Sequence, residues 1–426
     1  MVYVLNMLGQ PIMPTTDCRK VRLLLKQGKA VVVKRKPFTI RLTVRVKTYI
    51  QPVILGVDAG SKTVGLSAAT ANQELLAAEM QPRNDVVNNL STRREFRHSR
   101  RNRTTRYRAP RFNNRVHSKH KGWLAPSIEV KIQEHIAIIK RIINILPISK
   151  VIVETAEFDL QAIKAVQQDK PVPSGLDYQK GEQLGHYNVR QYVLYRDNYK
   201  CQCCKAHGKG IKLHVHHINS RKIGGDAPDN LITLCDSCHT KLHKGIIVLK
   251  AASKRKLKST KDAAFMGIMR KTLINCLRTE LNIPVRETRG YITKYTRVKL
   301  LKLTKSHTND ALAIVMSKQG FGITKPVLVA QQDYVYQYRP VRHHNRQLHK
   351  ASILRGGIRK YNQAPKYVKG FRLYDKVLYN GIECFIWGRR RTGSMLLRNL
   401  NGTLVKDGVN YKKLTLLERS SNYLIT

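Results

Sequence analysis

The stretch from Cys201 to His243 reads CQCCKAHGKGIKLHVHHINSRKIGGDAPDNLITLCDSCHTKLH, and it decides the fold of the middle of the chain. It contains two C-x-x-C hooks of equal spacing, Cys201/Cys204 and Cys235/Cys238. Two such hooks hold a tetrahedral zinc ion, because each places two thiolates on one side of the metal. Redox thiols are the alternative for both hooks, and Cys203 leaves a C-x-C pairing open in the first. We predict a structural zinc site formed by Cys201, Cys204, Cys235 and Cys238.

Histidines and an asparagine lie between and after the hooks. His216 and His217 end a short apolar run, Asn230 opens another, and the spacing of His239 and His243 puts both on one face of a helix. A closed four-cysteine site leaves no position for chemistry. The polar set outside it can cleave a phosphodiester, with one imidazole as base, others on a divalent ion and an amide to orient the base. A purely structural zinc domain is the alternative, which the His-His pair and Asn230 disfavour.

The pattern H-H-I, G-G, D-N-L and L-C-x-x-C-H resembles that of the zinc-stapled HNH nucleases, whose fold is called ββα-metal. The resemblance implies that His217 is the general base, that His216 is a magnesium ligand and that Asn230 orients the base. It leaves open whether His239 or His243 supplies the last position on the metal side.

The composition indicates a large polyanionic partner. The 426 residues carry 79 Lys and Arg against 27 Asp and Glu, a formal net charge of +52, and this balance favours nucleic acid. A membrane surface is the competing polyanion, but we expect neither a membrane-spanning segment nor a signal peptide. The 8 cysteines, four of them in the hooks, suit a reducing intracellular compartment.

Acidic residues lie at the ends of apolar elements elsewhere in the chain: Asp58 ends the first strand of an expected meander at 53–81, Glu154 ends a strand at 151–153, and Asp310 begins an apolar helix, with His307 one turn before it. Alone, each acid is equally well a turn, surface or capping residue. Together, the four residues can hold two divalent ions about 4 Å apart for in-line attack on a phosphodiester.

Arginines crowd residues 91–121, where only Glu95 opposes them, and aromatic residues are interleaved with them. A solvated tail is the alternative, but arginines fork onto phosphates and aromatic rings stack on bases, so we predict an RNA-binding helix that ends before Pro110. The predicted RNA-binding residues of the whole segment are Arg93, Arg94, Arg97, Arg100, Arg101, Arg103, Arg106, Arg108, Arg111 and Arg115.

The last third of the chain is expected to be helical at 263–282 and strand-like at 283–297, with Gly290 in a turn. From residue 334 the sequence is strongly basic and shows short strand patterns at 376–379, 384–387, 394–397 and 413–417, which are typical of a small β-barrel-like domain. Arg389, Arg390 and Arg391 fall in a hairpin of this domain and are predicted to bind DNA.

The order of these segments resembles a RuvC-type nuclease interrupted twice, as in the IscB family of transposon-encoded RNA-guided DNA endonucleases. The segment Pro11-Ile12-Met13-Pro14 is similar to the PLMP motif of that family, and Asp58-Ala59-Gly60-Ser61 departs from its frequent D-P-G-S. The resemblance implies an α/β multidomain fold: a split RNase H-like (RuvC) nuclease with an inserted zinc-stapled ββα-metal HNH module, a small N-terminal α/β domain and a C-terminal β-rich domain.

The domains implied are a PLMP-like domain at 1–50, RuvC part I at 51–90, the Arg-rich bridge helix at 91–122, RuvC part II with a linker at 123–185, the HNH domain at 186–250, RuvC part III at 251–325, and a domain that contacts the target-flanking motif and the guide RNA at 326–426. The magnesium ligands implied are His216, His239 and His243 in the HNH site and Asp58, Glu154 and Asp310 in the RuvC site.

The resemblance also implies an activity. A structured guide RNA of the omega RNA type selects a double-stranded DNA target, HNH cleaves the guide-paired strand and RuvC the displaced strand. Both centres use Mg²⁺, the Zn²⁺ is structural, and one protein monomer acts in a ribonucleoprotein in the prokaryotic cytoplasm, associated with the nucleoid when bound to DNA. A protein-only HNH/RuvC-type DNA endonuclease or resolvase is the alternative, and a non-catalytic nucleic-acid-binding protein is a third.

Overall fold

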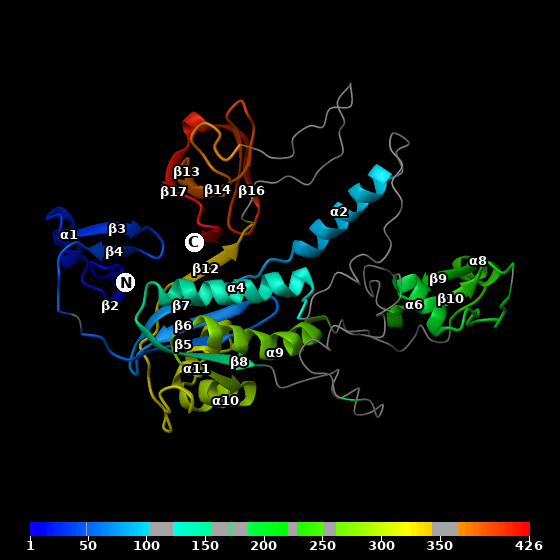
Figure 1. Ribbon diagram of the computed structural model, residues 1–426, viewed down its shortest axis with the longest axis horizontal. Helices are drawn as coiled ribbons and strands as arrows, with labels where there is room; N and C mark the ends of the chain where they lie inside the picture. Colours follow the sequence, from blue (N-terminus) through cyan, green and yellow to red (C-terminus); the bar gives the residue numbers. More distant parts are fainter. Residues whose placement is uncertain are drawn as a thin grey trace. The chain divides into compact units, whose positions relative to one another are not determined.

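The computed structural model describes residues 1–47, 49–101, 122–155, 171, 186, 188–208, 210–219, 228–249, 261–342 and 365–426, and within these ranges it leaves a few side chains undescribed. The chain divides into two compact units. The first consists of residues 1–109, 125–157 and 269–426, and the second of residues 110–124 and 158–268. Figure 1 labels most of the helices and strands of both.

A seven-stranded sheet organises the first unit, with the strand order β11-β8-β5-β6-β7-β12-β18 (Figure 1). Its strands are β5 (Val53–Asp58), β6 (Val64–Ala69), β7 (Glu74–Met80), β8 (Ile148–Thr155), β11 (Val285–Arg289), β12 (Val335–Pro340) and β18 (Tyr423–Ile425). The antiparallel meander β5–β7 is confirmed, and β8 and β11 extend the sheet parallel to β5. Side chains on both faces of β5 and β6 are buried, which explains why these strands read as apolar runs instead of alternating patterns.

Helix α11 (His307–Met316) covers one face of this sheet, and its residues from 311 to 316 are all buried. Two glycines let it approach closely. A Cβ atom at Gly56 in β5 would collide with the carbonyl oxygen of Ala311, and one at Gly65 in β6 would collide with that of His307. Because glycine permits such close backbone packing, the N-terminus of α11 lies beside the end of β5, where Asp58 stands.

Two long helices, α4 (Pro126–Ile143) and α9 (Lys261–Glu280), run across the sheet in Figure 1 and are joined by an ion pair of 2.7 Å between Lys140 and Glu280. In α4, Ile132, Ile136 and Ile139 are buried at helical spacing, while Ile128 and Ile143 are half-buried.

Smaller sheets complete the first unit. The N-terminal one has the order β2-β1-β4-β3 and is covered by helix α1 (Cys18–Lys26), which Asp17 caps by accepting a hydrogen bond from the amide of Lys20. Its strands are β1 (Val2–Leu5), β2 (Pro11–Thr15), β3 (Ala30–Lys34) and β4 (Thr39–Leu42). The C-terminal one has the order β16-β15-β14-β13-β17. Its strands are β13 (Lys376–Tyr379), β14 (Ile382–Arg389), β15 (Ser394–Arg398), β16 (Leu404–Asn410) and β17 (Thr415–Glu418).

The structure differs from the sequence prediction at residues 283–297. The strand β11 ends at Arg289, and Gly290 begins a helix, α10 (Gly290–Tyr295), that continues into the π-helical turn η3 (Thr296–Leu300). The buried positions of this segment, Thr293, Thr296, Arg297 and Leu300, have helical spacing. Apolar periodicity does not reveal this helix, because three of these four buried residues are polar.

The second unit contains a β-hairpin followed by a helix. Strands β9 (Leu213–His217) and β10 (Leu231–Cys235) pair antiparallel, and helix α8 (Asp236–His243) follows directly. Helix α6 (Val189–Arg196) precedes the hairpin, and the short 3-10 turn η2 (Pro228–Asn230) leads into β10.

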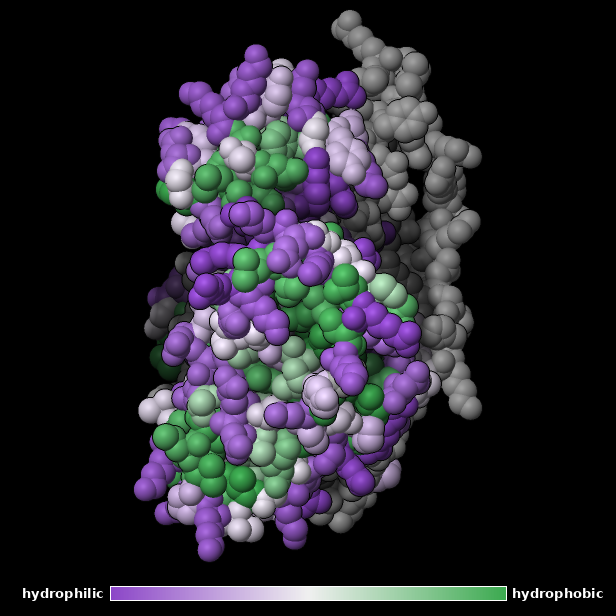
Figure 2. Space-filling model, turned by 90° about the vertical axis from the view of Figure 1, so that its left-hand side faces the viewer, coloured by the Kyte–Doolittle hydropathy of each residue, from purple (hydrophilic) through white to green (hydrophobic). Residues whose placement is uncertain are grey.

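Figure 2 shows a face on which hydrophilic residues separate smaller hydrophobic clusters. In the part of the chain that the structure describes, no helix combines the length and the apolar character needed to cross a lipid bilayer.

Glu134 on α4 gives the first unit a pH-dependent stability. Its side chain is 8% exposed and accepts a hydrogen bond of 2.8 Å from the amide of Arg83, and burial raises its pKa to about 7. Since the folded state holds a proton there that the unfolded state releases near its ordinary pKa, stability should fall as the pH rises from about 4.5 to about 7. Glu134→Gln should remove this dependence and stabilise the unit at pH 8 by roughly 2 kcal/mol.

Urea unfolding of the two proteins at pH 5 and pH 8 measures this effect. Glu129→Gln is the matched control, because Glu129 lies on the same helix but is exposed. An equal pH dependence in Glu134→Gln and the parent would contradict the prediction.

Candidate functional site

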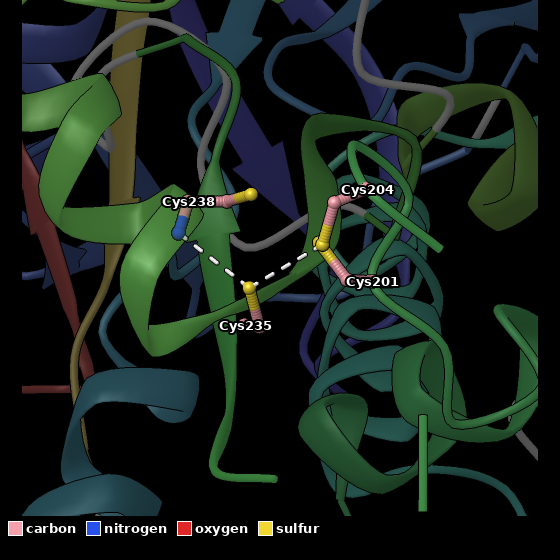
Figure 3. A group of neighbouring side chains, drawn as sticks. All are labelled: Cys201, Cys204, Cys235 and Cys238. Carbon is pink, nitrogen blue, oxygen red and sulfur yellow. Dashed lines mark hydrogen bonds between the residues drawn. The ribbon is translucent and has the colours of Figure 1, made fainter. Parts of the chain in front are cut away.

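Four cysteine sulfurs converge in the second unit (Figure 3). The Sγ atoms of Cys201, Cys204, Cys235 and Cys238 all lie within 4.8 Å of one another. Cys235 ends β10, and its sulfur accepts a hydrogen bond of 3.5 Å from the amide of Cys238 in the first turn of α8. Cys203 is exposed and stands outside this group. Four sulfurs at this spacing fit a tetrahedral Zn²⁺ ion.

Hydrogen bonding prepares one thiol of the cluster for ionisation. Burial raises the pKa of Cys201, but hydrogen bonds from the backbone at Cys204 and Cys235 outweigh it and lower the pKa to about 6. Burial and the neighbouring thiols raise the pKa of Cys238 instead. The thiolate is the form that binds metal, and a bound cation favours the thiolate form of its cysteine ligands.

Three imidazoles form a second candidate metal group. The ring nitrogens offered by His216, His239 and His243 lie within 4.8 Å of one another, with 3.2 Å between the Nε2 atoms of His239 and His243. His216 comes from β9, and the other two project from one face of α8, as their spacing predicts. Both helix histidines therefore join the group, where the sequence left open which one would.

The environment of His216 and His239 favours their neutral form. Burial and then the neighbouring imidazoles lower the pKa of both His216 and His239. Neutral imidazole is the form that ligates metals. Three nitrogen donors suit a transition-metal ion, whereas Mg²⁺ prefers oxygen ligands and would rely on water and substrate phosphate for the rest.

His217 follows His216 at the end of β9, and Asn230 directly precedes Leu231, the partner of His217 in β10. Consecutive residues of a strand point to opposite faces, so His217 does not join the metal group. Asn230 is fully buried, and its side chain accepts a hydrogen bond of 2.8 Å from the amide of Asn219 and donates one of 3.0 Å to the carbonyl of the same residue. It therefore fixes the backbone two residues after His217, which supports an orienting role exerted through the chain.

His214 is a site residue that the sequence analysis missed. Its ring stacks on that of His239 with centroids 4.8 Å apart and an angle of 13° between the planes, and its Nε2 lies 2.7 Å from Oδ1 of Asp236. The available signal was the alternation of strand β9, since His214 and His216 stand on the same face.

A separate group of carboxylates lies in the first unit, at the carboxyl ends of the central strands. Asp58 and Glu154 are direct partners in the parallel ladder between β5 and β8. Helix α11 brings His307 and Asp310 to the same place, and Nδ1 of His307 lies 2.6 Å from Oδ2 of Asp58. The structure thus gathers four residues that span 253 positions of sequence, from 58 to 310.

The carboxylates influence one another. Burial raises the pKa of Glu154, and the neighbouring charges of Asp58 and Asp310 raise it further. Burial also raises the pKa of Asp310, and the hydrogen bond to Asp58 raises that of His307. Carboxylate oxygens suit Mg²⁺ or Mn²⁺, yet among the described residues these three acids do not approach closely enough to count as a ready metal group.

The predicted nucleic-acid contacts are described only in part. The helix α2 (Val86–Arg101) confirms the helical first half of the arginine-rich segment, and Arg93 and Arg94 on it are exposed. The side chains of Arg97, Arg100 and Arg101 are not described, and Arg103, Arg106, Arg108, Arg111 and Arg115 lie outside the described residues.

The three arginines of the C-terminal hairpin differ from one another. Arg389 donates hydrogen bonds to the carbonyls of Pro365, Lys366 and Phe371, so it holds a loop in place. Arg390 pairs with Asp407 at 2.9 Å. Arg391 is exposed in the turn between β14 and β15, and of the three it is the one best placed to meet a nucleic acid.

Comparison with known proteins identifies two families along the chain. The family described as RRXRR protein matches residues 2–181, and the family described as HNH endonuclease matches residues 201–245. Anaredoxin from Nostoc sp. is 38% identical to this chain over 61 residues, which make up 14% of this chain and 78% of that protein.

Solved structures that resemble this chain include two Cas9 enzymes. Cas9 of Streptococcus thermophilus in complex with the GGAA PAM is 14% identical, with a TM-score of 0.32, and the match covers 53% of this chain and 29% of that one. The Type II-C Cas9 of Actinomyces naeslundii is 10% identical, with a TM-score of 0.18 and coverage of 62% and 60%. The chain therefore spans less than a third of the first of these proteins.

Proposed function

We propose, from the premise that this chain belongs to the IscB-like family of nucleases, that it is an RNA-guided DNA endonuclease with two nuclease centres. The observation that carries the proposal is that one chain of net charge +52 contains both groups. One is the imidazole group that includes His216, next to His217 in sequence, and the other is the carboxylate group around Asp58. With its HNH module, the protein is a metal-dependent DNA endonuclease. The second centre allows it to cut both strands of a duplex.

In the HNH centre, His217 accepts the proton of the attacking water. Asn230 keeps the strand end that carries His217 in place through its two bonds to Asn219. His216, His239 and His243 hold a divalent ion, which supplies Lewis-acid stabilisation of the charge on the phosphate when bound. The four cysteines hold the structural Zn²⁺ that fixes α8, and therefore two of these histidines, against the hairpin.

The second centre corresponds to a RuvC nuclease with an RNase H-like core. The antiparallel meander β5–β7, with β8 and β11 parallel to β5, supports this assignment. Asp58, Glu154 and Asp310 hold Mg²⁺, which polarises the scissile phosphate when bound, and His307 takes or gives the proton at its ring nitrogen. HNH cuts the strand paired with the guide, and this centre cuts the displaced strand.

Guide RNA of the omega RNA type and duplex DNA are the partners. Base pairing with the guide selects the target, so the protein needs mainly contacts to phosphates, which its basic composition provides. Exposed Arg93 and Arg94 on α2 belong to the RNA contacts, and Arg391 belongs to the DNA contacts. The protein acts as a monomer in a ribonucleoprotein in the prokaryotic cytoplasm, at the nucleoid when it is bound to DNA.

Sequencing the nucleic acid that co-purifies with the protein tests the role of RNA. Expression with its native flanking DNA should yield one structured RNA that leaves only at high salt, because many phosphate contacts give a steep salt dependence. The purified complex should then cut a duplex that matches the guide. Heterogeneous nucleic acid, together with metal-dependent cutting by RNA-free protein, would instead identify a protein-only endonuclease.

A further inference from the structure

A buried arginine lies against the carboxylate centre. Arg297 is 8% exposed, and its Nε lies 2.6 Å from Oδ1 of Asp310. Its Nη1 donates a hydrogen bond of 3.3 Å to the carbonyl of Leu303. The side chain is therefore held at both ends of its guanidinium group, with its charge directed at one of the proposed metal ligands.

The backbone that carries Arg297 is unusual. It belongs to the π-helical turn η3, which continues α10 and packs against α11. A π-helical turn shifts the following side chains around the helix axis and is frequent at functional sites. Here the turn places the guanidinium group of Arg297 on the buried face of the helix, a position where apolar side chains are the usual residues.

Each of two carboxylates at the centre has its own basic partner. His307 contacts Asp58 at 2.6 Å, and Arg297 contacts Asp310 at 2.6 Å. A guanidinium group cannot lose its charge at any ordinary pH, so the Arg297 pairing does not relax by deprotonation. These two pairs offset the repulsion between acids that lie close together in a half-buried position. Among the described residues, the carboxylates alone do not form a group close enough to hold a metal ion.

We propose that Arg297 is a positioning residue that holds Asp310 as its counter-ion until a divalent cation takes over that carboxylate. This inference rests on the proposed function of the carboxylate centre. A cation that binds Asp58, Glu154 and Asp310 must share Asp310 with a fixed positive charge or displace it. Arg297 therefore stabilises the metal-free centre and weakens its affinity for metal.

The test compares Mn²⁺ binding by calorimetry in a His216→Ala background, which removes one ligand of the imidazole group. Arg297→Gln should bind Mn²⁺ more tightly by about tenfold or more, since one nearby charge no longer repels the ion. Arg297→Lys keeps the charge and should bind like its parent. If Arg297→Gln bound Mn²⁺ equally well or more weakly than its parent, the inference would be overturned. Replacing a residue that has only a packing role would not raise the affinity of the centre for metal.

Stability without added divalent cations gives a second readout, which applies even if Arg297→Gln is destabilised. Removing one partner of a buried ion pair leaves an unpaired charge, whereas removing both does not. The double variant Arg297→Gln/Asp310→Asn should therefore be more stable than Arg297→Gln alone, and additive losses would contradict the pairing. Asp58→Ala, made in the same His216→Ala background, separates the two proposals. If Asp58→Ala binds Mn²⁺ as well as its parent does, the carboxylate centre is not a metal site, and the proposed function fails independently of Arg297.

Discussion

Replacing His217 with alanine should abolish cutting of the guide-paired strand and leave the displaced strand cut at the parental rate. Loss of a general base lowers the rate of its own step by about 10²–10⁴-fold. The carboxylate centre does not depend on this imidazole, because its residues belong to a different compact unit of the chain. Asp58→Ala should give the reciprocal result. Labelling each strand of a guide-matched duplex at a different end measures both rates in one reaction.

The controls for this prediction come from the same strand and the same helix. His214→Gln should retain much of the HNH activity, because His214 supports His239 by stacking but is not a member of the metal group. Asn309→Ala replaces a side chain of α11 that bonds to Thr304 and Gln331 instead of to the carboxylates. If His217→Ala and Asp58→Ala each abolished cutting of both strands in a folded protein, the assignment of one centre to each strand would be wrong.

The sequence predicted those features that depend on local pattern. The hooks around Cys201 and Cys235 have a spacing that metal chemistry imposes, and the structure brings their sulfurs together. The strand β5 follows from an apolar run that ends at Asp58, and it is present. The register that places Asp58 opposite Glu154 could be anticipated because both acids lie at the carboxyl ends of neighbouring buried strands.

Contacts set by tertiary packing could not be predicted in this way. The role of Arg297 depends on the π-helical turn η3, and its buried helical face is made mostly of polar residues that periodicity does not detect. Arg389 lies in the predicted hairpin, but its guanidinium binds backbone carbonyls that are 18 to 24 residues away in sequence. The strand β18 leaves the C-terminal sheet and pairs with β12 in the central one, which short strand patterns cannot reveal.

Cys235→Ser should unfold the HNH module and leave the first unit folded. The second unit has little else to hold it: its described apolar clusters are small, and one of them is built around Cys201, Cys235 and Cys238 themselves. Structural zinc contributes about 10–16 kcal/mol of apparent binding free energy in small zinc modules, more than a cluster of this size supplies. Cys235 also ends β10 and caps α8 at its N-terminus, so its loss frees the helix that carries His239 and His243.

Zinc content, limited proteolysis and strand-specific cleavage together measure this collapse. The variant should lose its zinc, be cut by protease within residues 188–249, and retain only cutting of the displaced strand. Cys203→Ser is the matched control: Cys203 is exposed beside the first hook and stands outside the sulfur group, so this variant should keep both zinc and HNH activity. Loss of zinc from Cys203→Ser but not from Cys204→Ser would reassign the first hook to the C-x-C pairing. Retention of HNH activity by zinc-free Cys235→Ser would show that the helix is held without metal, and the zinc would then have no structural role.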